Sequence, residues 1–258
     1  MTPHFSRRRF LAGLASGAGV LALAGCDRLA QNADVDAVLR NTEKLTMGSQ
    51  RALLPRQRLA REYAETDLSP VFRANGTQMP DSEEYAHLLE REFADWRLQV
   101  DGLVQRPQSL SLAELKRFPS RTQITRHDCV EGWSAIGKWQ GVPLAHVLDA
   151  AGLKPGARYV VLHCADELEK ALDGSGRYYE SIDLLDAYHP QTILAYGMNG
   201  EALPVPHGAP LRLRVERQLG YKHAKYLMRI EVVDAFSAQF GGKGGYWEDR
   251  GYEWYAGI

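Results

Sequence analysis

One stretch of this sequence, Arg126-His127-Asp128-Cys129-Val130-Glu131-Gly132-Trp133, decides how the rest of the chain is interpreted. It follows neither a helical nor a strand period, and it gathers ionisable and aromatic residues around Cys129. A single cysteine is by default a small buried hydrophobe. The cation at Arg126 and the nearby histidine instead favour a thiolate, which is the form that binds a metal or attacks carbon.

Two further chemistries are open at this stretch. One is a zinc or copper site, with four candidate ligands: His127, Cys129, His163 and Cys164. The geometry disfavours it, because neighbours on a strand point to opposite faces and the spacing matches no structural zinc pattern. The other is a Cys–His hydrolase, although no family-type sequence surrounds Cys129.

Three ordered motifs follow the cysteine. They are Trp139-Gln140-Gly141-Val142-Pro143-Leu144, His207-Gly208-Ala209-Pro210-Leu211-Arg212 and Gly220-Tyr221-Lys222-His223-Ala224-Lys225-Tyr226-Leu227. Together with the first stretch they resemble the molybdopterin-binding domain of the sulfite oxidase family, over roughly residues 70–235. The sequence Cys-Val-Glu-Gly-Trp is closest to the bacterial periplasmic methionine-sulfoxide reductases of that family.

The resemblance implies a molybdenum–molybdopterin cofactor with one pterin dithiolene. Cys129 would then be both the metal ligand and the catalytic residue, since a soft thiolate suits a metal already bound by sulfur. The implied cofactor-binding residues are Asn75, Cys164, His207, Arg212, His223, Ala224 and Lys225. Arg212 and Lys225 would hold the pterin phosphate. Cys164 stands where the reductases have a cofactor-contacting threonine.

The function implied is that of an exported molybdenum oxidoreductase that transfers an oxygen atom. Reduction of an S-oxide such as methionine sulfoxide is favoured, because the Arg-rich continuation that follows the cysteine in sulfite oxidases is missing. The alternatives are sulfite dehydrogenase-like oxidation and a non-catalytic binding lipoprotein with the same fold. Electrons would come from a separate donor, for which a membrane cytochrome is a candidate. Trp133, Tyr246, Trp247 and Tyr252 are candidates for the substrate pocket, with a place in the core as the alternative.

The first 26 residues are expected to be an export signal. Ser6-Arg7-Arg8-Arg9-Phe10-Leu11 resembles a twin-arginine signal, and Leu23-Ala24-Gly25-Cys26 resembles a lipobox. The apolar run from Phe10 to Gly25 has 16 residues, about 24 Å of helix, which is short of the ~30 Å hydrocarbon core of a bilayer. We therefore expect a periplasmic or otherwise extracytoplasmic protein, anchored to the membrane by lipid at Cys26.

The composition argues against two further classes, a nucleic-acid-binding protein and a disulfide-rich scaffold. The chain has 258 residues, 45% of them hydrophobic, and 31 basic residues against 32 acidic ones. This balance produces no positive field that would attract nucleic acid. Three cysteines are too few for a disulfide scaffold.

The predicted organisation is a helical arm or linker over residues 27–66, broken at Pro55, followed by an oxidoreductase domain over residues 67–258. The domain is expected to be α+β, with a mixed sheet and short surrounding helices. Helices are predicted after Asp81, after a Ser111–Glu114 capping box, from Pro143, and over Ser181 to Tyr188. Strands are predicted over residues 96–101, 159–164, 211–215 and 226–232, with a hairpin around Asn199-Gly200.

Overall fold

A computed structural model describes residues 33–171 and 176–258 and divides into two units between Leu53 and Leu54. The described part of the first unit is one helix, α2 (Ala33–Leu53), which ends before Pro55 as the sequence predicts. Residues 54–66, expected in the arm, belong to the second unit. The twin-arginine-like signal and the lipobox lie outside the described residues. Among the described helices, none combines the length and apolar character needed to cross a bilayer.

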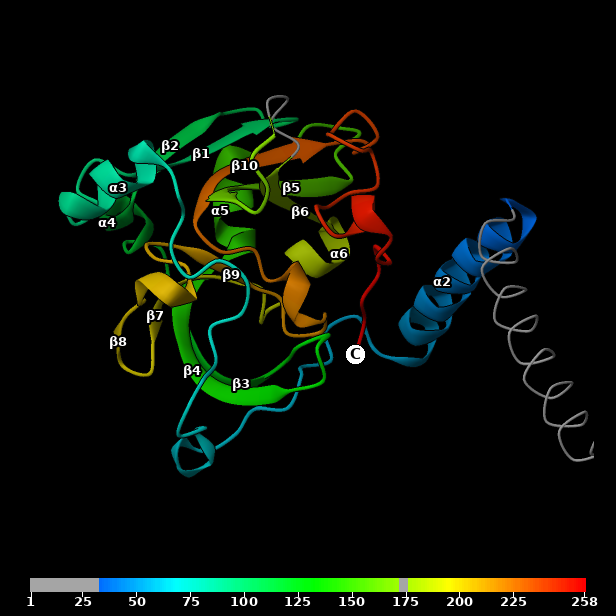
Figure 1. Cartoon of the computed structure of the whole chain (residues 1–258), viewed down its shortest axis with the longest axis horizontal. Coiled ribbons are helices and arrows are strands. Elements are labelled where there is room, and N and C mark those ends of the chain that lie inside the picture. The colour runs from blue at the N-terminus through cyan, green and yellow to red at the C-terminus, as the bar shows by residue number, and fades with distance from the viewer. Residues whose placement is uncertain (1–32, 172–175) are drawn as a thin grey trace, which may run out of the picture. The chain divides into compact units, whose positions relative to one another are not determined.

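Two five-stranded sheets form the framework of the second unit (Figure 1). The first sheet has the order β2-β1-β10-β5-β6 and is mixed, because β1 and β10 are parallel and all other neighbours are antiparallel. Its strands are β1 (Arg97–Gly102), β2 (Gln108–Ser111), β5 (Tyr159–Glu167), β6 (Arg177–Asp183) and β10 (Leu227–Val233). The mixed sheet expected from the sequence is therefore present.

The second sheet is antiparallel throughout, with the order β3-β4-β7-β8 and β9 paired to β7. Its strands are β3 (Arg121–Asp128), β4 (Ser134–Pro143), β7 (Ile193–Met198), β8 (Glu201–Ala202) and β9 (Arg212–Arg214). Figure 1 shows the long β3–β4 ribbon curving below the first sheet. The predicted hairpin joins β7 to β8 through Asn199 and Gly200, both with positive φ, as a two-residue hairpin turn of this type requires.

Short helices connect the strands. They are α3 (Glu83–Glu90), α4 (Leu112–Leu115), α5 (Leu144–Ala151), α6 (Leu184–Ala187) and the 3-10 turns η1 (Glu65–Asp67), η2 (Val205–His207), η3 (Gly220–Lys222) and η4 (Glu248–Arg250). The Ser111–Glu114 capping box of α4 is confirmed. The cap of α3 is Ser82 rather than Asp81, because the Ser82 hydroxyl accepts the Tyr85 amide.

Two local predictions are wrong because tertiary burial overrides the local pattern. Residues 126–128 are the end of β3 rather than irregular chain. Residues 181–183 continue β6 rather than open a helix, since Ser181 and Ile182 are buried and pair with β5. The strand predicted over residues 211–215 is present as β9, and its charged residues Arg212 and Arg214 are buried, as is Glu216.

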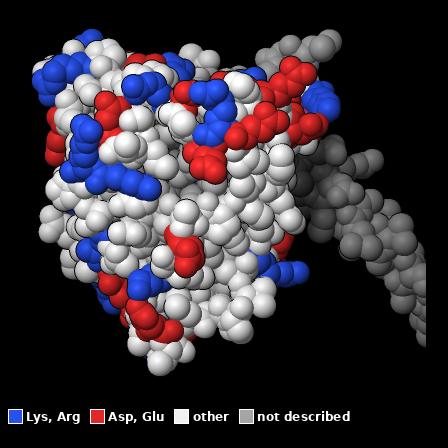
Figure 2. Space-filling model, turned by 90° about the vertical axis from the view of Figure 1, so that its left-hand side faces the viewer, with Lys and Arg blue, Asp and Glu red and all other residues white. Residues whose placement is uncertain are grey.

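The main core lies on one face of the first sheet. Trp96, Leu98 and Val100 from β1 and its approach pack in one cluster with Val147 and Leu148 of α5. The same cluster includes apolar residues of β5 and β10 and of the segment around β9, so it joins the two sheets. On the face of the molecule shown in Figure 2, Lys and Arg side chains are interspersed with Asp and Glu around a broad area without charge.

Candidate functional site

Loops and strand ends that are far apart in the sequence meet around a pocket of about 160 Å³. It is lined by Asn75–Thr77, Cys129–Glu131, Asp166, Leu168, Tyr178, Gly220, Tyr221, His223, Lys225, Trp247 and Tyr252. Four of the residues proposed from the sequence lie here together: Asn75, Cys129, His223 and Lys225.

Cys129 begins the loop that joins β3 to β4. Its amide donates to the carbonyl of Trp133 at 2.9 Å, and the Gly132 amide donates back to the Cys129 carbonyl at 3.0 Å. Gly132 has a φ of 84°, which favours glycine, so this tight loop needs glycine at that position. The hairpin thereby holds the Cys129 sulfur at the pocket wall with the side chain only 7% exposed.

The thiol of Cys129 is not activated in the way the sequence indicated. Arg126 forms an ion pair with Asp128 at 2.9 Å, with its side chain half exposed, and so does not act on the sulfur. Burial raises the pKa of the Cys129 thiol, and the backbone amide of Glu131 only partly opposes this. The expectation of a thiolate stabilised by Arg126 is therefore wrong. A coordinated metal deprotonates a thiol without such help.

Asn75 is the protein group next to this sulfur. Its side-chain Nδ2 donates to Cys129 Sγ at 3.8 Å. The carbonyls of Asn75 and Thr77 accept hydrogen bonds from the Lys225 ammonium, so one loop contacts both the cysteine and the lysine. The loop therefore sets the spacing between a soft ligand and a cation.

Two buried cations, Arg212 and Lys225, stand beside the pocket without a carboxylate in direct contact. Lys225 donates to carbonyls, including those of Asn75 at 2.7 Å and Pro206 at 3.1 Å. Arg212 lies behind the lining and donates to the carbonyls of His207 and His223. Burial, followed by the charge of Arg212, lowers the pKa of Lys225 to about 7. Burial, followed by the charge of Arg214, lowers the pKa of Arg212 to about 9.

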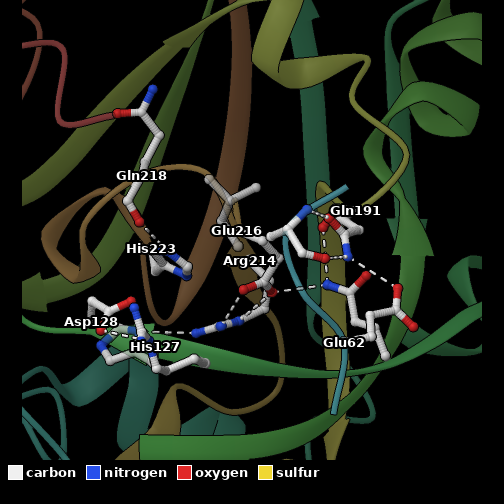
Figure 3. Close-up of polar contacts among 12 residues, drawn as sticks. Glu62, His127, Asp128, Gln191, Arg214, Glu216, Gln218 and His223 are labelled. Carbon is white, nitrogen blue, oxygen red and sulfur yellow. Dashed lines mark hydrogen bonds and ion pairs between the residues drawn. The ribbon is translucent and has the colours of Figure 1, made fainter. Parts of the chain in front are cut away.

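A buried polar network supports the base of the cysteine hairpin (Figure 3). Arg214 forms a two-point ion pair with Glu216 and donates Nη1 to His127 Nδ1 at 2.9 Å. Because a guanidinium cannot accept, Nδ1 of His127 carries no proton and the neutral ring holds it on Nε2. Burial and the charge of Arg214 hold the pKa of His127 well below its usual range. Figure 3 also shows the side-chain amide of Gln191 donating a hydrogen bond to Glu62, a residue of the segment before the first sheet.

The four remaining predicted residues do not line the pocket. Cys164 is buried in the main core on β5, with its thiol pKa raised well above the usual range by burial. The His207 ring packs edge-on against Phe72, and burial followed by the charge of Arg212 lowers the pKa of His207 to about 4. Ala224 is buried and its carbonyl accepts the Leu213 amide. Their roles toward a cofactor, like that of Arg212, stay predictions.

Sequence reasoning missed Asp166, which lines the pocket two residues after Cys164 on β5. The strand period gave no signal, because Cys164, two residues earlier on β5, lies in the main core and not in the pocket wall. It also missed the buried ion-pair cluster in which Lys222 Nζ contacts Glu180 and Glu248, each at 2.5 Å. Burial, followed by the charge of Glu248, raises the pKa of Glu180 well above its usual range. Of the four aromatic candidates, Trp247 and Tyr252 line the pocket, and their rings stack at 5.2 Å.

The zinc alternative finds no support in the described residues. Residues 33–171 and 176–258 contain no group of three or more His, Cys, Asp or Glu side chains placed to share an ion. His163 contacts Glu231 on the neighbouring strand at 2.9 Å instead of joining His127 and Cys129.

The donor set fits a molybdenum–pterin group better than a protein-only metal site. A thiol at the pocket wall can supply one soft ligand, and two buried cations provide charge for a phosphate. Two lining residues also have buried polar atoms without a partner in the described protein, Oδ1 of Asp166 and Nδ1 of His223. His223 Nε2 faces the Gln218 carbonyl at 3.1 Å, so its Nδ1 is an acceptor. These atoms match a ligand rich in N–H donors.

Comparison with known proteins defines the class. Residues 86–240 match the model of the oxidoreductase molybdopterin binding domain, which is more than half of the chain. The chain belongs to this family, so it is a molybdopterin-dependent oxidoreductase with the α+β fold that the sequence motifs indicated. The family resemblance and the cofactor predicted from the sequence are thereby confirmed.

Individual proteins of known name are similar to this chain over different shares of its length. The chain is 36% identical over 252 residues to "Putative protein-methionine-sulfoxide reductase subunit YedZ1" of Azospira oryzae, which covers 98% of this chain and 88% of that protein. It is 35% identical over 171 residues to the protein-methionine-sulfoxide reductase catalytic subunit MsrP of Ralstonia nicotianae, covering 63% of this chain and 50% of that one. The chain thus spans about half the length of this MsrP. The crystal structure of the sulfane dehydrogenase SoxCD from Paracoccus pantotrophus aligns over 54% of this chain and 38% of that chain, with 27% identity and a TM-score of 0.48.

Proposed function

We propose that this chain reduces S-oxides, with protein-bound methionine sulfoxide as the favoured substrate. The reaction takes up two electrons and two protons, breaks the sulfur–oxygen bond and releases a thioether and water. The observation that carries the proposal is a single cysteine at the wall of a pocket that also holds a buried cation. The names of its relatives from Azospira and Ralstonia support the direction of the reaction.

The chain's own residues have distinct tasks in this proposal. The molybdenum–pterin group supplies the two-electron redox chemistry when bound. Cys129 holds the metal, and the Asn75 amide, 3.8 Å from its sulfur, stabilises negative charge there. Lys225 lines the pocket and Arg212 lies behind it, so their charges favour the pterin phosphate. The stacked rings of Trp247 and Tyr252 offer the apolar surface that thioether groups favour.

Electrons reach the site from outside this chain in our proposal. The described residues contain no group of three or more His, Cys, Asp or Glu side chains that could hold a further metal, which is in keeping with a separate donor. A membrane cytochrome would suit a protein that is exported through its twin-arginine-like signal and anchored at Cys26. These assignments rest on the sequence of the first 26 residues.

The test is turnover by molybdenum-loaded protein. Purified full-length chain is assayed with methionine sulfoxide and an artificial electron donor, and in parallel with sulfite and an artificial acceptor. We expect sulfoxide reduction to exceed sulfite oxidation by at least about tenfold in rate, which corresponds to about 1.4 kcal/mol of activation free energy. Faster sulfite oxidation would reverse the assigned direction. Loaded protein inactive in both assays would favour the binding lipoprotein.

A further inference from the structure

Residues 241–254 supply one wall of the pocket through the stacked rings of Trp247 and Tyr252, here called the aromatic wall. All residues of this segment are described, and the regular element among them is the 3-10 turn η4. The segment follows residues 86–240, which match the family model. Because neither of the two described sheets includes a strand from this segment, side-chain contacts must hold its two rings in place.

One of these contacts is a buried ion pair. Lys222 of η3 donates to Glu180 on β6 and to Glu248 in η4, each at 2.5 Å, and all three side chains are at most 1% exposed. One ammonium beside two carboxylates would leave an unbalanced negative charge in the interior. Burial, followed by the charge of Glu248, raises the pKa of Glu180 well above its usual range. Glu180 therefore keeps its proton, and Lys222 and Glu248 form the charged pair.

Glu248 lies within the segment that carries the aromatic wall, whereas Glu180 belongs to the first sheet. Glu248 directly follows Trp247, and the Tyr252 amide donates to the Trp247 carbonyl at 3.0 Å, so both rings belong to the turn that contains Glu248. A Cβ atom on Gly245 would lie 2.0 Å from Glu248 Oε2 and 2.7 Å from Glu180 Oε1. The backbone of the segment therefore packs directly on the two carboxyl groups.

We propose that Glu248 is a positioning residue for substrate binding, because its ion pair with Lys222 holds the aromatic wall against which the thioether part of an S-oxide packs. The inference rests on the proposed function in taking an S-oxide as the substrate. Lys222 stands between Tyr221 and His223, which both line the pocket, so the pair joins the aromatic wall to another part of the lining. Glu248 is not itself a lining residue and acts through the wall.

This role predicts an effect on substrate affinity rather than on the chemical step. Packing of an apolar group against the rings is the same before and during the breaking of the sulfur–oxygen bond. Loss of such uniform binding raises KM and leaves kcat unchanged. A residue that acted on the reacting atoms would instead lower kcat.

Other contacts should keep the segment attached when the ion pair is removed. The Trp254 indole N–H donates to the Ser181 hydroxyl at 2.9 Å, and the Tyr179 hydroxyl donates to Asp249 at 2.6 Å. Both contacts join the segment to β6. We therefore expect variants of Glu248 to fold, with an aromatic wall that is looser but still present.

The experiment measures KM and kcat of the full-length, molybdenum-loaded chain with methionine sulfoxide and an artificial electron donor. We expect Glu248→Ala to raise KM by at least about tenfold, with kcat within about twofold of the wild type. Glu248→Gln keeps an oxygen that accepts from Lys222 and should give an intermediate KM. Glu180→Gln is the matched control, since it changes the other carboxyl group on the same ammonium, and it should keep the wild-type KM.

Hydrogen exchange of the cofactor-free chains gives a second measurement that does not depend on activity. The amides of Asp249 and Tyr252 donate to the carbonyls of Gly245 and Trp247 within the segment. They should exchange at least about tenfold faster in Glu248→Ala than in the wild type or in Glu180→Gln, while the amides of β10 remain unchanged.

Three results would contradict the positioning role. Wild-type KM or wild-type exchange in Glu248→Ala would overturn it. Loss of molybdenum from Glu248→Ala alone would also overturn it, because the wall would then serve the cofactor rather than the substrate. If the loaded wild type reduces no S-oxide, the proposed function fails, whereas the exchange rates still decide whether Glu248 holds the aromatic wall.

Discussion

The amide nitrogen of Asn75 lies 3.8 Å from the sulfur of Cys129, although the two residues are 54 positions apart in the chain. The contact brings the loop before the first sheet onto the tip of the β3–β4 hairpin. Asn75 also accepts a hydrogen bond from Lys225 at its backbone carbonyl, so it links the predicted metal ligand to this cation. The properties of the sulfur therefore depend on a segment outside its own hairpin.

Replacing the cysteine should remove activity without removing the fold. We expect Cys129→Ala to lower turnover by more than about 100-fold. Because the change is small, the free energy of unfolding should move by less than about 1 kcal/mol. Asn75→Ala removes the side-chain amide, and with it the N–H donor to the sulfur, and should cost about tenfold in turnover. Full turnover by Cys129→Ala would remove Cys129 from the mechanism.

Arg212 should control how much cofactor the protein holds. Arg212→Ala is expected to lower molybdenum content by at least about tenfold, and Arg212→Lys to give an intermediate value because it keeps the charge. Arg229→Ala is the matched control, since Arg229 pairs with Asp101 on the first sheet and does not line this pocket. Elemental analysis decides, and unchanged molybdenum in Arg212→Ala would argue against a phosphate role.

Lys222 should contribute strongly to stability. Lys222→Met leaves Glu180 and Glu248 buried without their shared cation, so we expect a loss of about 3–5 kcal/mol in urea unfolding. Adding Glu248→Gln to Lys222→Met should recover part of this loss, because it removes one of the two like charges. Lys170 forms a fully exposed pair with Asp81, and Lys170→Met should leave unfolding unchanged. A similar result for the two lysines would refute the ion-pair cluster as a stabilising element.

Glycine at position 220 should be required by the packing of His127. A Cβ atom on Gly220 would lie 2.6 Å from His127 Nε2, so the ring or η3 must move. We expect Gly220→Ala to lower the free energy of unfolding by about 1–3 kcal/mol and to reduce pterin content. The same substitution at Gly48, which has nothing within 4 Å, is the control. Equal stability of Gly220→Ala and the wild type would mean that the site adjusts freely.

The contribution of Asp166 to the stability of the cofactor-free protein should fall as pH rises from about 4 to about 6. Asp166 has a pKa near 6 in the folded chain against a usual value of 3.8, so the folded state binds its proton more tightly. Between these values the contribution of Asp166 falls with rising pH, by about 3 kcal/mol in all. The free energy of unfolding of Asp166→Asn, measured in urea, should therefore rise relative to that of the wild type over this pH range. Parallel stability curves would contradict the raised pKa.

The sequence predicted the elements whose signals are local. The capping box of Ser111 and Glu114, the Asn199-Gly200 turn and the helix that begins after Pro143 each depend on a few neighbouring residues. The family motifs also indicated which residues gather around the cofactor, and Asn75, Cys129, His223 and Lys225 do share one pocket.

Features that depend on burial by distant segments could not be predicted in this way. Residues 212–216 carry alternating charges, which locally indicate a solvated strand face, but the contacts of Arg214 with Glu216 and His127 bury them. The burial of polar residues on β3 could not be predicted for the same reason. The side-chain amide of Gln123, for example, donates to Glu216, which is 93 positions away in the chain. The position of Asp166 in the pocket depends on where β5 ends relative to η3, which local patterns do not encode.

The pocket takes its walls from positions between Asn75 and Tyr252, and this has a consequence for how the enzyme matures. A chain still emerging from the ribosome cannot enclose a prosthetic group until Trp247 and Tyr252 have been synthesised and docked. Insertion of the pterin must therefore follow translation and near-complete folding. Partly assembled chains would expose an unfinished cavity and would be expected to capture the group poorly.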